Sequence, residues 1–451
     1  MAEKSRNSSL TAAKKAKNDE FYTQWADIER EMNAYLEYDP DVFRGKTVLL
    51  PCDDPEWSNF AKFFALHFSD YGLKKLISTS YAPNSNPNVK DVYAPTLFEF
   101  DDPKFDETKT RENGKKFVLD ANDLNGDGRV DIDDLTWEYL EGDGDFRSPE
   151  VTELRDEADF VITNPPFSLF RDFLGWLVEG DVRFSIVGNS NAITYREVFP
   201  LIKGNKLWKG ATANSTDMVF GVPKGTAVKE ADRQKAERMG YASNDEYDFT
   251  RLGNSCWFTN IEHGRRHEPL QLMTTADNAK FSRHKDVRDS NYATYDNFEA
   301  IEVPYVDAIP SDHQGIMGVP ITFLDKYNPD QFEILGTTEG DYPATKKYAK
   351  KKRVVNGVPQ KSNTGTMSGV IRESEFGKGT YFDVGYPVRA VYKRILIRHR
   401  NEANGNLRVV FGEGTGLQDV EVESPNSTVN VRKVTDEQGN TRLVAEGGSA
   451  E

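Results

Sequence analysis

Cysteines are scarce in this 451-residue sequence, and long apolar runs are missing. The two cysteines, Cys52 and Cys256, lie far apart, which leaves neither a disulfide framework nor the closely spaced pairs of a zinc site. No stretch approaches the roughly 18 consecutive apolar residues that a membrane helix needs. The N-terminal segment carries basic residues but no apolar run, so no signal peptide is predicted. These features predict a cytoplasmic protein without a membrane partner.

Positive charge is also in short supply, because the formal net charge is -16. Taken alone, this value argues against binding to nucleic acid, whose phosphates are contacted mainly by Lys and Arg. The basic residues are clustered, however, at Lys14–Lys17, His263–His267, Lys346–Arg353 and Tyr392–Arg400. Each run can equally be a solvated surface. A basic C-terminal half beside a more acidic N-terminal half is compatible with a DNA-binding protein.

The N-terminal 265 residues predict an α/β architecture. Residues 1–40 are expected to form a polar arm followed by a helix over 19–38, where apolar residues recur three and four positions apart. In residues 41–265, short apolar runs alternate with helical segments, which is typical of a doubly wound, mostly parallel sheet covered by helices. An acidic insertion at 101–145 interrupts this alternation.

The rest of the chain is less regular. Residues 266–410 contain aromatic and basic segments without a clear repeat, and residues 411–451 predict a hairpin followed by a flexible tail. Ligands of a doubly wound sheet bind at the carboxyl ends of its strands. We therefore expect the residues that follow the predicted strands to border one crevice; they are Cys52–Pro55, Tyr81, the segment 141–148 and Asn164.

The sequence Asn164-Pro165-Pro166-Phe167 follows one of these apolar strands. Two prolines fix two φ angles, and a residue before proline is held extended. The Asn164 side-chain oxygen and the Pro165 carbonyl can then converge as two acceptors on one amino group, which favours its nucleophilic, pyramidal form. Phe167 offers a face on which a flat base can stack. The alternative is a proline-stiffened loop that only caps a strand.

Asn-Pro-Pro-Phe after an apolar strand resembles the catalytic motif of amino-methyltransferases that use S-adenosylmethionine. The segment Asn18–Gln24, NDEFYTQ, resembles the Phe-Tyr-Thr segment with which these enzymes contact the methionine end of the cofactor. A longer collinear series over residues 14–400 is similar to the EcoRI-type DNA adenine-N6 methyltransferase family; it comprises DEFYTQ, CDDP, SNF, GLKKLI, GDGDFRS, TNPPFSLFR, AITYREVF, GVPITFLDKYNPDQFEI and RILI.

This resemblance implies a Rossmann-like class I methyltransferase fold followed by a C-terminal DNA-recognition region at 266–410. It also implies S-adenosylmethionine as cofactor and double-stranded DNA as partner. Two settings stay open from the sequence, a restriction-modification system with a cognate restriction endonuclease as functional partner, and an orphan modification enzyme without one. The motif residues Asn164, Pro165, Pro166 and Phe167 would hold and stack the target adenine. The cofactor would be contacted at three places, by Phe21, Tyr22 and Thr23, by Cys52, Asp53 and Asp54, and by Asp145 and Phe146.

Two departures from the family pattern concern the cofactor. The first turn reads PCDDPEWSNF without the usual glycines, and the second strand ends at Tyr81 with no acidic residue for the ribose. Asp53, Asp54 or another carboxylate would have to bind the ribose, or none does.

The reaction implied is a direct in-line methyl transfer to N6 of an adenine that has left the base stack, which costs a few kcal/mol. Trp208 and Phe220 are candidates to pack against that base, although the protein core is the commoner place for such residues.

The segment Asp123–Asp134, DLNGDGRVDIDD, matches the spacing of a calcium-binding loop. Its oxygen ligands would come from Asp123, Asn125, Asp127, Arg129 (carbonyl), Asp131 and Asp134. Closure by Asp134 rather than by the longer Glu resembles dockerin-type loops and favours a structural ion over a calcium sensor. The alternative is a surface turn rich in Asp and Gly.

Three classes of function remain open from the sequence. The first is a DNA adenine-N6 methyltransferase. The second is a transferase of the same fold that acts on RNA adenine or on a protein glutamine. The third is a binding module, either a calcium-dependent scaffold or a catalytically silent DNA binder; the missing signal peptide disfavours the scaffold, and the intact Asn164–Phe167 motif disfavours the silent binder.

Overall fold

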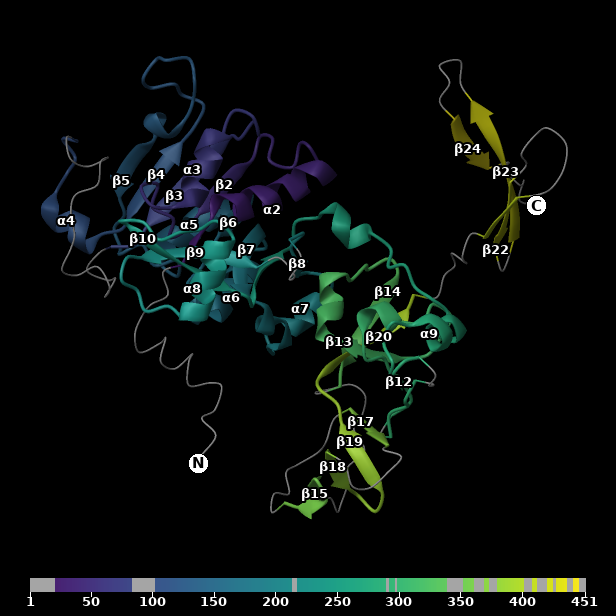
Figure 1. The fold of residues 1–451 in the computed structure, drawn as a ribbon. Coiled ribbons are helices and arrows are strands. Elements are labelled where there is room, and N and C mark those ends of the chain that lie inside the picture. Colours follow the sequence, from purple (N-terminus) through teal and green to yellow (C-terminus); the bar gives the residue numbers. More distant parts are fainter. Residues whose placement is uncertain are drawn as a thin grey trace. The chain divides into compact units, whose positions relative to one another are not determined.

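A computed structural model describes residues 21–82, 102–212, 217–288, 292–296, 298–338, 352–360, 369–372 and 379–400, and the backbone of four strands within 408–445 (Figure 1). The basic run at Lys14–Lys17 and the predicted flexible end at 446–451 lie outside the described residues. The chain forms two compact units, residues 1–270 with 321–329, and residues 271–320 with 330–451.

An eight-stranded sheet forms the centre of the first unit. In spatial order its strands are β5 (Thr136–Tyr139), β4 (Lys115–Leu119), β3 (Lys75–Ser80), β2 (Thr47–Leu50), β6 (Phe160–Thr163), β7 (Arg183–Asn189), β11 (Ser255–Thr259) and β8 (Trp208–Lys209). The chain passes from β2 to β3 on one side and later returns to β6 on the other side of β2. The carboxyl ends of β2 and β6 therefore lie side by side where the strand order reverses.

The prediction of a mostly parallel sheet is wrong for the complete sheet, which is mixed. The four central strands β3, β2, β6 and β7 run parallel to one another. β4 and β5 add to one edge as antiparallel strands, and β11 and β8 do so at the other edge. The physical reason at the first edge is that β4 and β5 both come from the acidic insertion between β3 and β6, and an antiparallel strand does not need the crossover helix that a parallel strand requires.

Helices of the first unit connect these strands, and side-chain caps mark where several of them begin. The α-helices are α2 (Trp25–Tyr38), α3 (Asn59–Leu66), α4 (Glu107–Glu112), α5 (Pro149–Glu157), α6 (Phe170–Glu179), α7 (Phe199–Lys203) and α8 (Glu230–Arg238). Short 3-10 helices are η1 (Ile132–Asp134), η2 (Phe167–Leu169), η3 (Ser190–Thr194), η4 (Gly264–His267) and η6 (Ile321–Asp325). The Ser58 hydroxyl caps α3 by accepting from the Phe60 N–H at 3.0 Å, and Ser148 caps α5.

The first predicted helix begins later than expected. The pattern predicts a helix over 19–38, whereas α2 begins at Trp25 and residues 22–23 form strand β1. β1 (Tyr22–Thr23) pairs with β9 (Met218–Pro223) in a three-stranded antiparallel sheet completed by β10 (Tyr247–Leu252). The partner strand lies almost 200 residues away in the sequence (Thr23 pairs with Phe220), so helical periodicity alone could not reveal this pairing.

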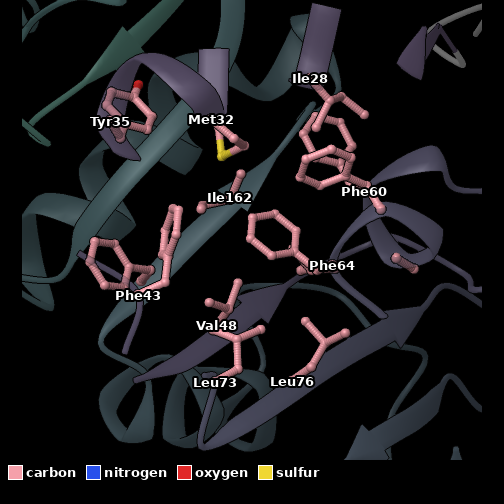
Figure 2. Packing of buried hydrophobic residues seen from close by; sticks show 14 of the residues in the cluster. Ile28, Met32, Tyr35, Phe43, Val48, Phe60, Phe64, Leu73, Leu76 and Ile162 are labelled. Carbon is pink, nitrogen blue, oxygen red and sulfur yellow. The ribbon is translucent and has the colours of Figure 1, made fainter. Parts of the chain in front are cut away.

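The core of the first unit is rich in phenylalanine. Figure 2 shows Ile28 and Met32 of α2 pointing toward Phe64 of α3, Val48 of β2 and Ile162 of β6. All of these side chains are buried. Each buried side chain of this size contributes about 1.5–3 kcal/mol to folding, so the packing of α2 and α3 on the central strands fixes the strand ends near which the predicted site residues lie.

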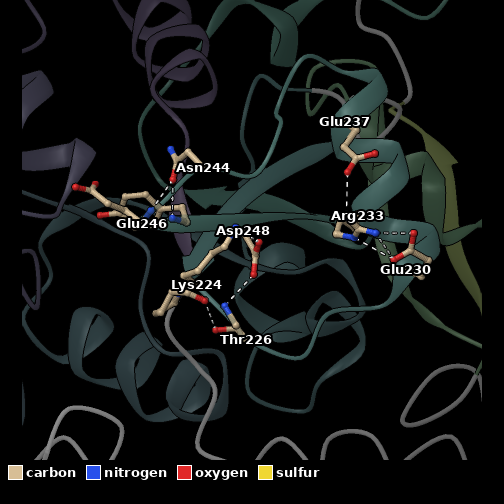
Figure 3. Close-up of polar contacts among 11 residues, drawn as sticks. Lys224, Thr226, Glu230, Arg233, Glu237, Asn244, Glu246 and Asp248 are labelled. Carbon is tan, nitrogen blue, oxygen red and sulfur yellow. Dashed lines mark hydrogen bonds and ion pairs between the residues drawn. The ribbon is translucent and has the colours of Figure 1, made fainter. Parts of the chain in front are cut away.

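Polar contacts hold the turn between β9 and β10, which carries α8 (Figure 3). Asp248 accepts from the Gly225 N–H at 2.9 Å and pairs with Lys224 at 3.1 Å. Asn244 Oδ1 accepts from the Glu246 and Tyr247 N–H groups at 2.9 and 2.7 Å. Within α8, Arg233 bridges Glu230 and Glu237, four or fewer residues away. These contacts make β9 and β10 a stable support for β1.

The described residues of the second unit form three sheets. The first consists of β12 (Ile301–Glu302), β13 (Met317–Pro320), β20 (Arg394–His399) and β14 (Phe332–Thr337). The second consists of β16 (Val358–Pro359), β15 (Lys352–Val355), β18 (Thr380–Asp383), β19 (Pro387–Ala390) and β17 (Val370–Arg372). The third consists of β21 (Arg408–Phe411), β22 (Val420–Ser424), β23 (Ser427–Thr435) and β24 (Thr441–Ala445); the unit also has α9 (Thr275–Phe281) and η5 (Val306–Ala308).

A buried ion pair organises the first of these sheets. Glu302 of β12 accepts two hydrogen bonds from the Arg394 guanidinium of β20, at 2.8 and 2.6 Å, and another from the Tyr295 hydroxyl. Glu302 and Tyr295 are buried. Breaking such a pair from one side leaves an uncompensated charge in the interior, so this contact is expected to be essential for the unit's fold.

Among the described helices, none combines the length and the apolar composition that crossing a membrane requires.

Candidate active site

Asp53 lies at the carboxyl end of β2 and connects the central strands. One carboxylate oxygen accepts from the Ser58 hydroxyl and the other from the Thr163 hydroxyl, each at 2.6 Å. Its backbone carbonyl accepts from the Ser78 hydroxyl of β3. The residue is 7% exposed, and burial raises the pKa of its carboxyl group to about 7, against the lowering effect of the two hydroxyl donors. Asp53 therefore stabilises the turn after β2 through internal hydrogen bonds. The neighbouring Asp54 is only partly buried, so it is the more accessible of the two carboxylates.

Cys52 shapes the same turn. Its φ of 66° is in the left-handed region that residues other than glycine rarely adopt, and its N–H donates to the Thr79 hydroxyl at 3.1 Å. Burial, followed by the nearby carboxylates of Asp53, Asp145 and Asp143, raises the pKa of the thiol to about 12. The thiol is thus neutral at physiological pH and is no nucleophile.

The segment with Asp143 and Asp145 lies against the end of β3. The Ala82 N–H donates to the Asp143 carbonyl at 2.8 Å, and burial together with the Asp143 carboxylate raises the pKa of Tyr81 to about 12. Gly144 has a φ of 86°, and a Cβ there would lie 2.2 Å from the Ser80 carbonyl oxygen. Glycine is required for this close approach. The approach places the segment 141–148 against Ser80 and Tyr81 at the end of β3.

Asp145 and Phe146 occupy different environments. Arg147 donates to both oxygens of Asp145, at 2.9 and 2.5 Å, and this bond lowers the pKa of that carboxyl below its usual value. Phe146 is 2% exposed and packs edge-on against Phe173 and Trp176 of α6. Its ring has little free surface for a cofactor, whereas the Asp145 carboxylate is partly exposed.

Asn164 follows the last residue of β6. Its Nδ2 donates to the Phe21 carbonyl at 2.5 Å, and its Oδ1 is buried and accepts no hydrogen bond from the described residues. A buried acceptor without a donor is costly in a folded protein. The amide is therefore oriented with an unused acceptor beside the Pro165–Phe167 segment.

Aromatic rings surround this amide. Phe167 of the motif stacks on Phe21 with 5.5 Å between ring centroids, and both contact Phe220 of β9 edge-on. Phe220 is completely buried, so it belongs to the core. Trp208 donates from its ring nitrogen to the Ile261 carbonyl and stacks under the Arg266 guanidinium at 3.6 Å. These contacts place both predicted base-packing candidates in structural roles.

Tyr22 and Thr23 reach the site through β1. The Thr23 carbonyl accepts from Asn59 Nδ2 at 2.8 Å, and the Tyr22 ring packs edge-on against Tyr247. The Thr23 hydroxyl oxygen is buried and has no partner among the described residues. A buried hydroxyl that finds no acceptor among the described residues is suited to a polar group of a bound ligand.

In the calcium-loop segment Asp123–Asp134, carboxylate side chains accept hydrogen bonds from backbone N–H groups of the same segment. Asp123 accepts from the Gly126 and Gly128 N–H groups at 2.6 and 2.8 Å. Asp134 accepts from the N–H groups of Asp131, Leu124 and Asn125, and these donors lower its pKa, with the Asp131 bond contributing most. Within the described ranges, no group of three or more His, Cys, Asp or Glu side chains is placed to hold a metal ion. The carboxylates of the loop are held mainly by backbone N–H donors.

The basic runs proposed for DNA are partly internal. Arg266 of the run His263–His267 is buried and pairs with Glu262 at 2.6 Å. In the run Tyr392–Arg400, Arg394 pairs with Glu302 and Arg398 pairs with Glu333 at 2.7 Å, while the Tyr392 ring is 89% exposed. These pairings reduce the positive charge that either run offers to a phosphate backbone.

A polar cleft of about 650 Å³ lies beside α2 and η4. Its lining residues are Arg30, Asn33, Ala34, Glu37, Tyr38, Ala211, Gly264, Arg265 and Glu268. None of the predicted catalytic or cofactor residues is among them, so this cleft is separate from the site around Asn164.

The structure thus brings Asn164, Phe167, Phe21 and Thr23 together and places Asp53 and Asp145 at neighbouring strand ends. Sequence reasoning missed Ser58 and Thr163, which hold Asp53, and Asp143, which lies beside Tyr81. The repeated Gly-Asp of the segment 141–148 was a signal for Asp143. Ser58 and Thr163 had no such signal, because hydroxyl residues are common in caps and strands.

Comparison with known proteins shows the family of this chain. The family model described as "Adenine-specific methyltransferase EcoRI" matches residues 9–400. The chain is 39% identical over 343 residues to the type II methyltransferase M.EcoRI of Escherichia coli, covering 75% of this chain and 92% of that protein. It is 34% identical over 330 residues to the type II methyltransferase M.MpnI of Mycoplasma pneumoniae, covering 73% and 86%. It is 33% identical to the type II methyltransferase M.MgeORF184P of Mycoplasma genitalium. No solved structure gives a significant match.

Proposed function

Because the chain belongs to the EcoRI family of adenine-specific methyltransferases, we propose that Asn164 holds N6 of a flipped adenine while that amine accepts a methyl group. The chain is a DNA (adenine-N6) methyltransferase that uses S-adenosylmethionine and double-stranded DNA. One observation carries the assignment to Asn164, namely that its Oδ1 is a buried acceptor to which none of the described residues donates.

The chemistry at the amine follows from the geometry of the motif. An adenine N6 group has two N–H donors, and the Asn164 Oδ1 and the Pro165 carbonyl would accept one each. Accepting both bonds at fixed positions favours the form of the nitrogen whose lone pair can attack a methyl group. Phe167 would stack on the purine ring, as base-flipping enzymes use aromatic side chains for this purpose. Pro165 and Pro166 keep the loop from rearranging when the base enters.

We further propose which residues bind the cofactor. S-adenosylmethionine supplies a sulfonium methyl group for direct transfer to the amine. The Thr23 hydroxyl is buried beside β9 and has no partner in the described part of the chain; it would contact the methionine end of the cofactor together with Phe21 and Tyr22. Arg147 keeps Asp145 ionised at neutral pH, so that carboxylate could accept hydrogen bonds from the ribose hydroxyls. Asp54 and Asp143 are the further candidates, whereas the packing of Phe146 and the internal bonds of Asp53 make direct contact by these two residues less favourable.

The arrangement of strands supports a Rossmann-like class I methyltransferase fold. Four parallel strands in the order β3, β2, β6, β7 place the Cys52–Asp54 turn and Asn164 at adjacent carboxyl ends. Ligands of open α/β sheets bind at such a reversal of strand order. Residues 266–410 are proposed to form the DNA-recognition region. Within its described part, the exposed side chains of Tyr392 and of Lys352 and Arg353 in β15 are candidates to contact DNA.

The cellular setting remains a proposal. Relatives named as type II methyltransferases support a cognate restriction endonuclease that cuts the same site when it is unmethylated. Action on DNA also favours the cytoplasm.

Labelled S-adenosylmethionine offered with separate pools of DNA, RNA and protein tests the function. We expect label in DNA, recovered as N6-methyladenine after digestion. Label confined to RNA, or to a glutamine side chain, would support the alternative substrate of the same fold instead. Sequencing of the methylated DNA would then define the recognition site.

Calcium binding is a second proposal. The segment Asp123–Asp134 has the oxygen ligands of a calcium loop at the expected spacing, and its backbone turns as such loops do, with Gly126 and Gly128 at positive φ. An ion there would stabilise the acidic insertion that supplies β4 and β5.

A further inference from the structure

We infer that strand β1 positions the catalytic amide, because the Phe21 carbonyl holds Asn164 Nδ2 and thereby presents Oδ1 to the target amine. This inference rests on the proposed function of Asn164. It assigns a role to a backbone carbonyl of the N-terminal segment, in addition to the cofactor contacts proposed for the side chains of the same segment.

The orientation of the amide depends on this bond. An asparagine side chain can rotate by half a turn at little cost unless its two ends meet different partners. Here Nδ2 lies 2.5 Å from the Phe21 carbonyl oxygen. The rotated amide would place Oδ1 against that oxygen, so two acceptors would face each other without a proton between them. The Phe21 carbonyl therefore selects the orientation in which Oδ1 faces away from it and has no donor within the described ranges.

Strand β1 is short and depends on several contacts to remain in place. It pairs with β9 through two residues, Tyr22 with Gly221 and Thr23 with Phe220. Asn59 Nδ2 donates to the Thr23 carbonyl at 2.8 Å, and the Phe21 ring stacks on Phe167. A two-residue strand is weak by itself, so the bond from Asn164 contributes to holding β1 as well as being held by it.

This arrangement connects the cofactor with the target base. Tyr22 and Thr23 are proposed to contact the cofactor, and the preceding residue holds the catalytic amide. Any ligand that stabilises β1 in place also stabilises the productive amide, and by linkage a bound adenine stabilises β1. Asn164 is the catalytic residue, and β1 is a positioning element.

The substitution Asn164→Asp separates positioning from hydrogen-bond acceptance. The variant keeps an oxygen where Oδ1 lies but places a second oxygen against the Phe21 carbonyl. At about pH 8 the carboxylate is ionised, and we expect the kcat for DNA methylation to fall by about 100-fold through misplacement. As the pH falls toward about 5.5, a growing fraction of the carboxyl group is protonated and can donate to Phe21. The ratio of variant to wild-type kcat should therefore rise by about tenfold.

The opposite pH dependence would overturn the inference. If Asn164 acted through Oδ1 alone, the carboxylate would be the better acceptor, and the variant would lose activity relative to wild type as the pH falls. Absence of DNA methylation by the wild-type protein would instead refute the proposed function. A measurement that does not depend on enzyme activity is therefore needed to test the contact between Asn164 and β1.

Hydrogen exchange of residues 21–24 in the cofactor-free protein provides that second readout. At about pH 7, where the carboxyl group is ionised, Asn164→Asp should exchange at least about threefold faster than wild type in this segment. Peptides from β2 and β6 should be unchanged, which shows that the variant is folded. The matched control is Asn33→Asp, which adds the same charge at an exposed position of α2 and should leave residues 21–24 unaffected. Equal protection of β1 in Asn164→Asp and wild type would contradict the anchor.

Asn59→Ala loosens β1 while leaving Asn164 intact. We expect faster exchange at residues 21–24 and a lower kcat for methylation at saturating DNA and cofactor. A loosened β1 with an unchanged kcat would also overturn the positioning role.

Discussion

Asp53 and Thr163 join the two central strands of the sheet, with 2.6 Å between Asp53 Oδ2 and Thr163 Oγ1. Thr163 is the residue immediately before Asn164. The bond therefore fixes the base of the Asn-Pro-Pro-Phe loop to the turn after β2, and any change at Asp53 is transmitted to the proposed catalytic residue through one peptide unit.

The first prediction concerns Asp53 and pH. Because burial raises the pKa of its carboxyl group to about 7 in the folded protein, the folded state binds more protons than the unfolded state between the unfolded value of 3.8 and about 7. As the pH rises through this window, the free energy of unfolding of the wild-type protein should decrease, and this group should account for at most about 4 kcal/mol of the decrease. In Asp53→Asn, which cannot ionise, that contribution is removed. Urea unfolding from about pH 4 to about pH 8 measures the difference; a constant difference between the two proteins would contradict the shifted pKa.

The second prediction concerns the proposed catalytic amide. Asn164→Ala removes both the acceptor for the amine and the donor to Phe21. We expect methylation to fall by at least about 1,000-fold, because an acceptor aimed at the reacting nitrogen is lost. Cofactor affinity should change by less than about tenfold, and calorimetric titration with S-adenosylmethionine checks this. Retained methylation would remove Asn164 from the catalytic role.

The third prediction concerns Glu31 of α2, which is completely buried. Its carboxylate accepts from the Ala211 and Thr212 N–H groups at 2.9 Å each, and from the hydroxyls of Tyr35 and Thr212 at 2.7 Å. Glu31→Ala leaves these donors unsatisfied, so the free energy of unfolding should fall by about 2–5 kcal/mol. Glu37→Ala, at an exposed position of the same helix, is the control and should change it by less than about 0.5 kcal/mol.

The fourth prediction concerns the close approach at Gly144. A Cβ at this position would lie 2.2 Å from the Ser80 carbonyl oxygen, and the φ of 86° is unfavourable for alanine. Gly144→Ala should lower the free energy of unfolding by about 2 kcal/mol or more and weaken cofactor binding by displacing Asp143 and Asp145. Gly142→Ala is the matched control, since nothing lies within 4 Å of its Cβ. Similar effects of the two substitutions would argue against this packing.

The fifth prediction concerns the loop Asp123–Asp134. Bound calcium should raise the melting temperature of the wild-type protein, because an ion that binds the folded state stabilises it by mass action. Asp123→Ala should abolish that increase, while Asp133→Ala, outside the ligand set, should preserve it. A melting temperature that responds to neither chelator nor calcium would exclude a structural ion.

The basic runs show the limit of reading charge along a sequence. His263–His267 is a cluster of positive residues, but Arg266 is buried against Trp208 and paired with Glu262. Likewise Arg394 is held by Glu302, which lies 92 residues away. A sequence shows which charges are present, whereas their availability to a partner depends on distant acidic residues.

The sequence by itself determined the features that arise from short-range physics. Apolar runs placed the central strands, and two prolines after β6 determined a stiff loop, because their restrictions act within one or two residues. The family membership also came from collinear motifs, and the comparisons confirmed it.

The tertiary structure alone decided how these segments are used. Residues 22–23 form a strand rather than the start of a helix because β9 offers them a partner. The Asp53 carboxylate is hydrogen-bonded by Ser58 and Thr163, and Phe146 packs against α6. These internal contacts leave little of either side chain open to a ligand, and they depend on residues that are distant in the sequence. Asn164 is oriented by Phe21, 143 residues earlier, since a hydrogen bond depends on distance in space and not on separation along the chain.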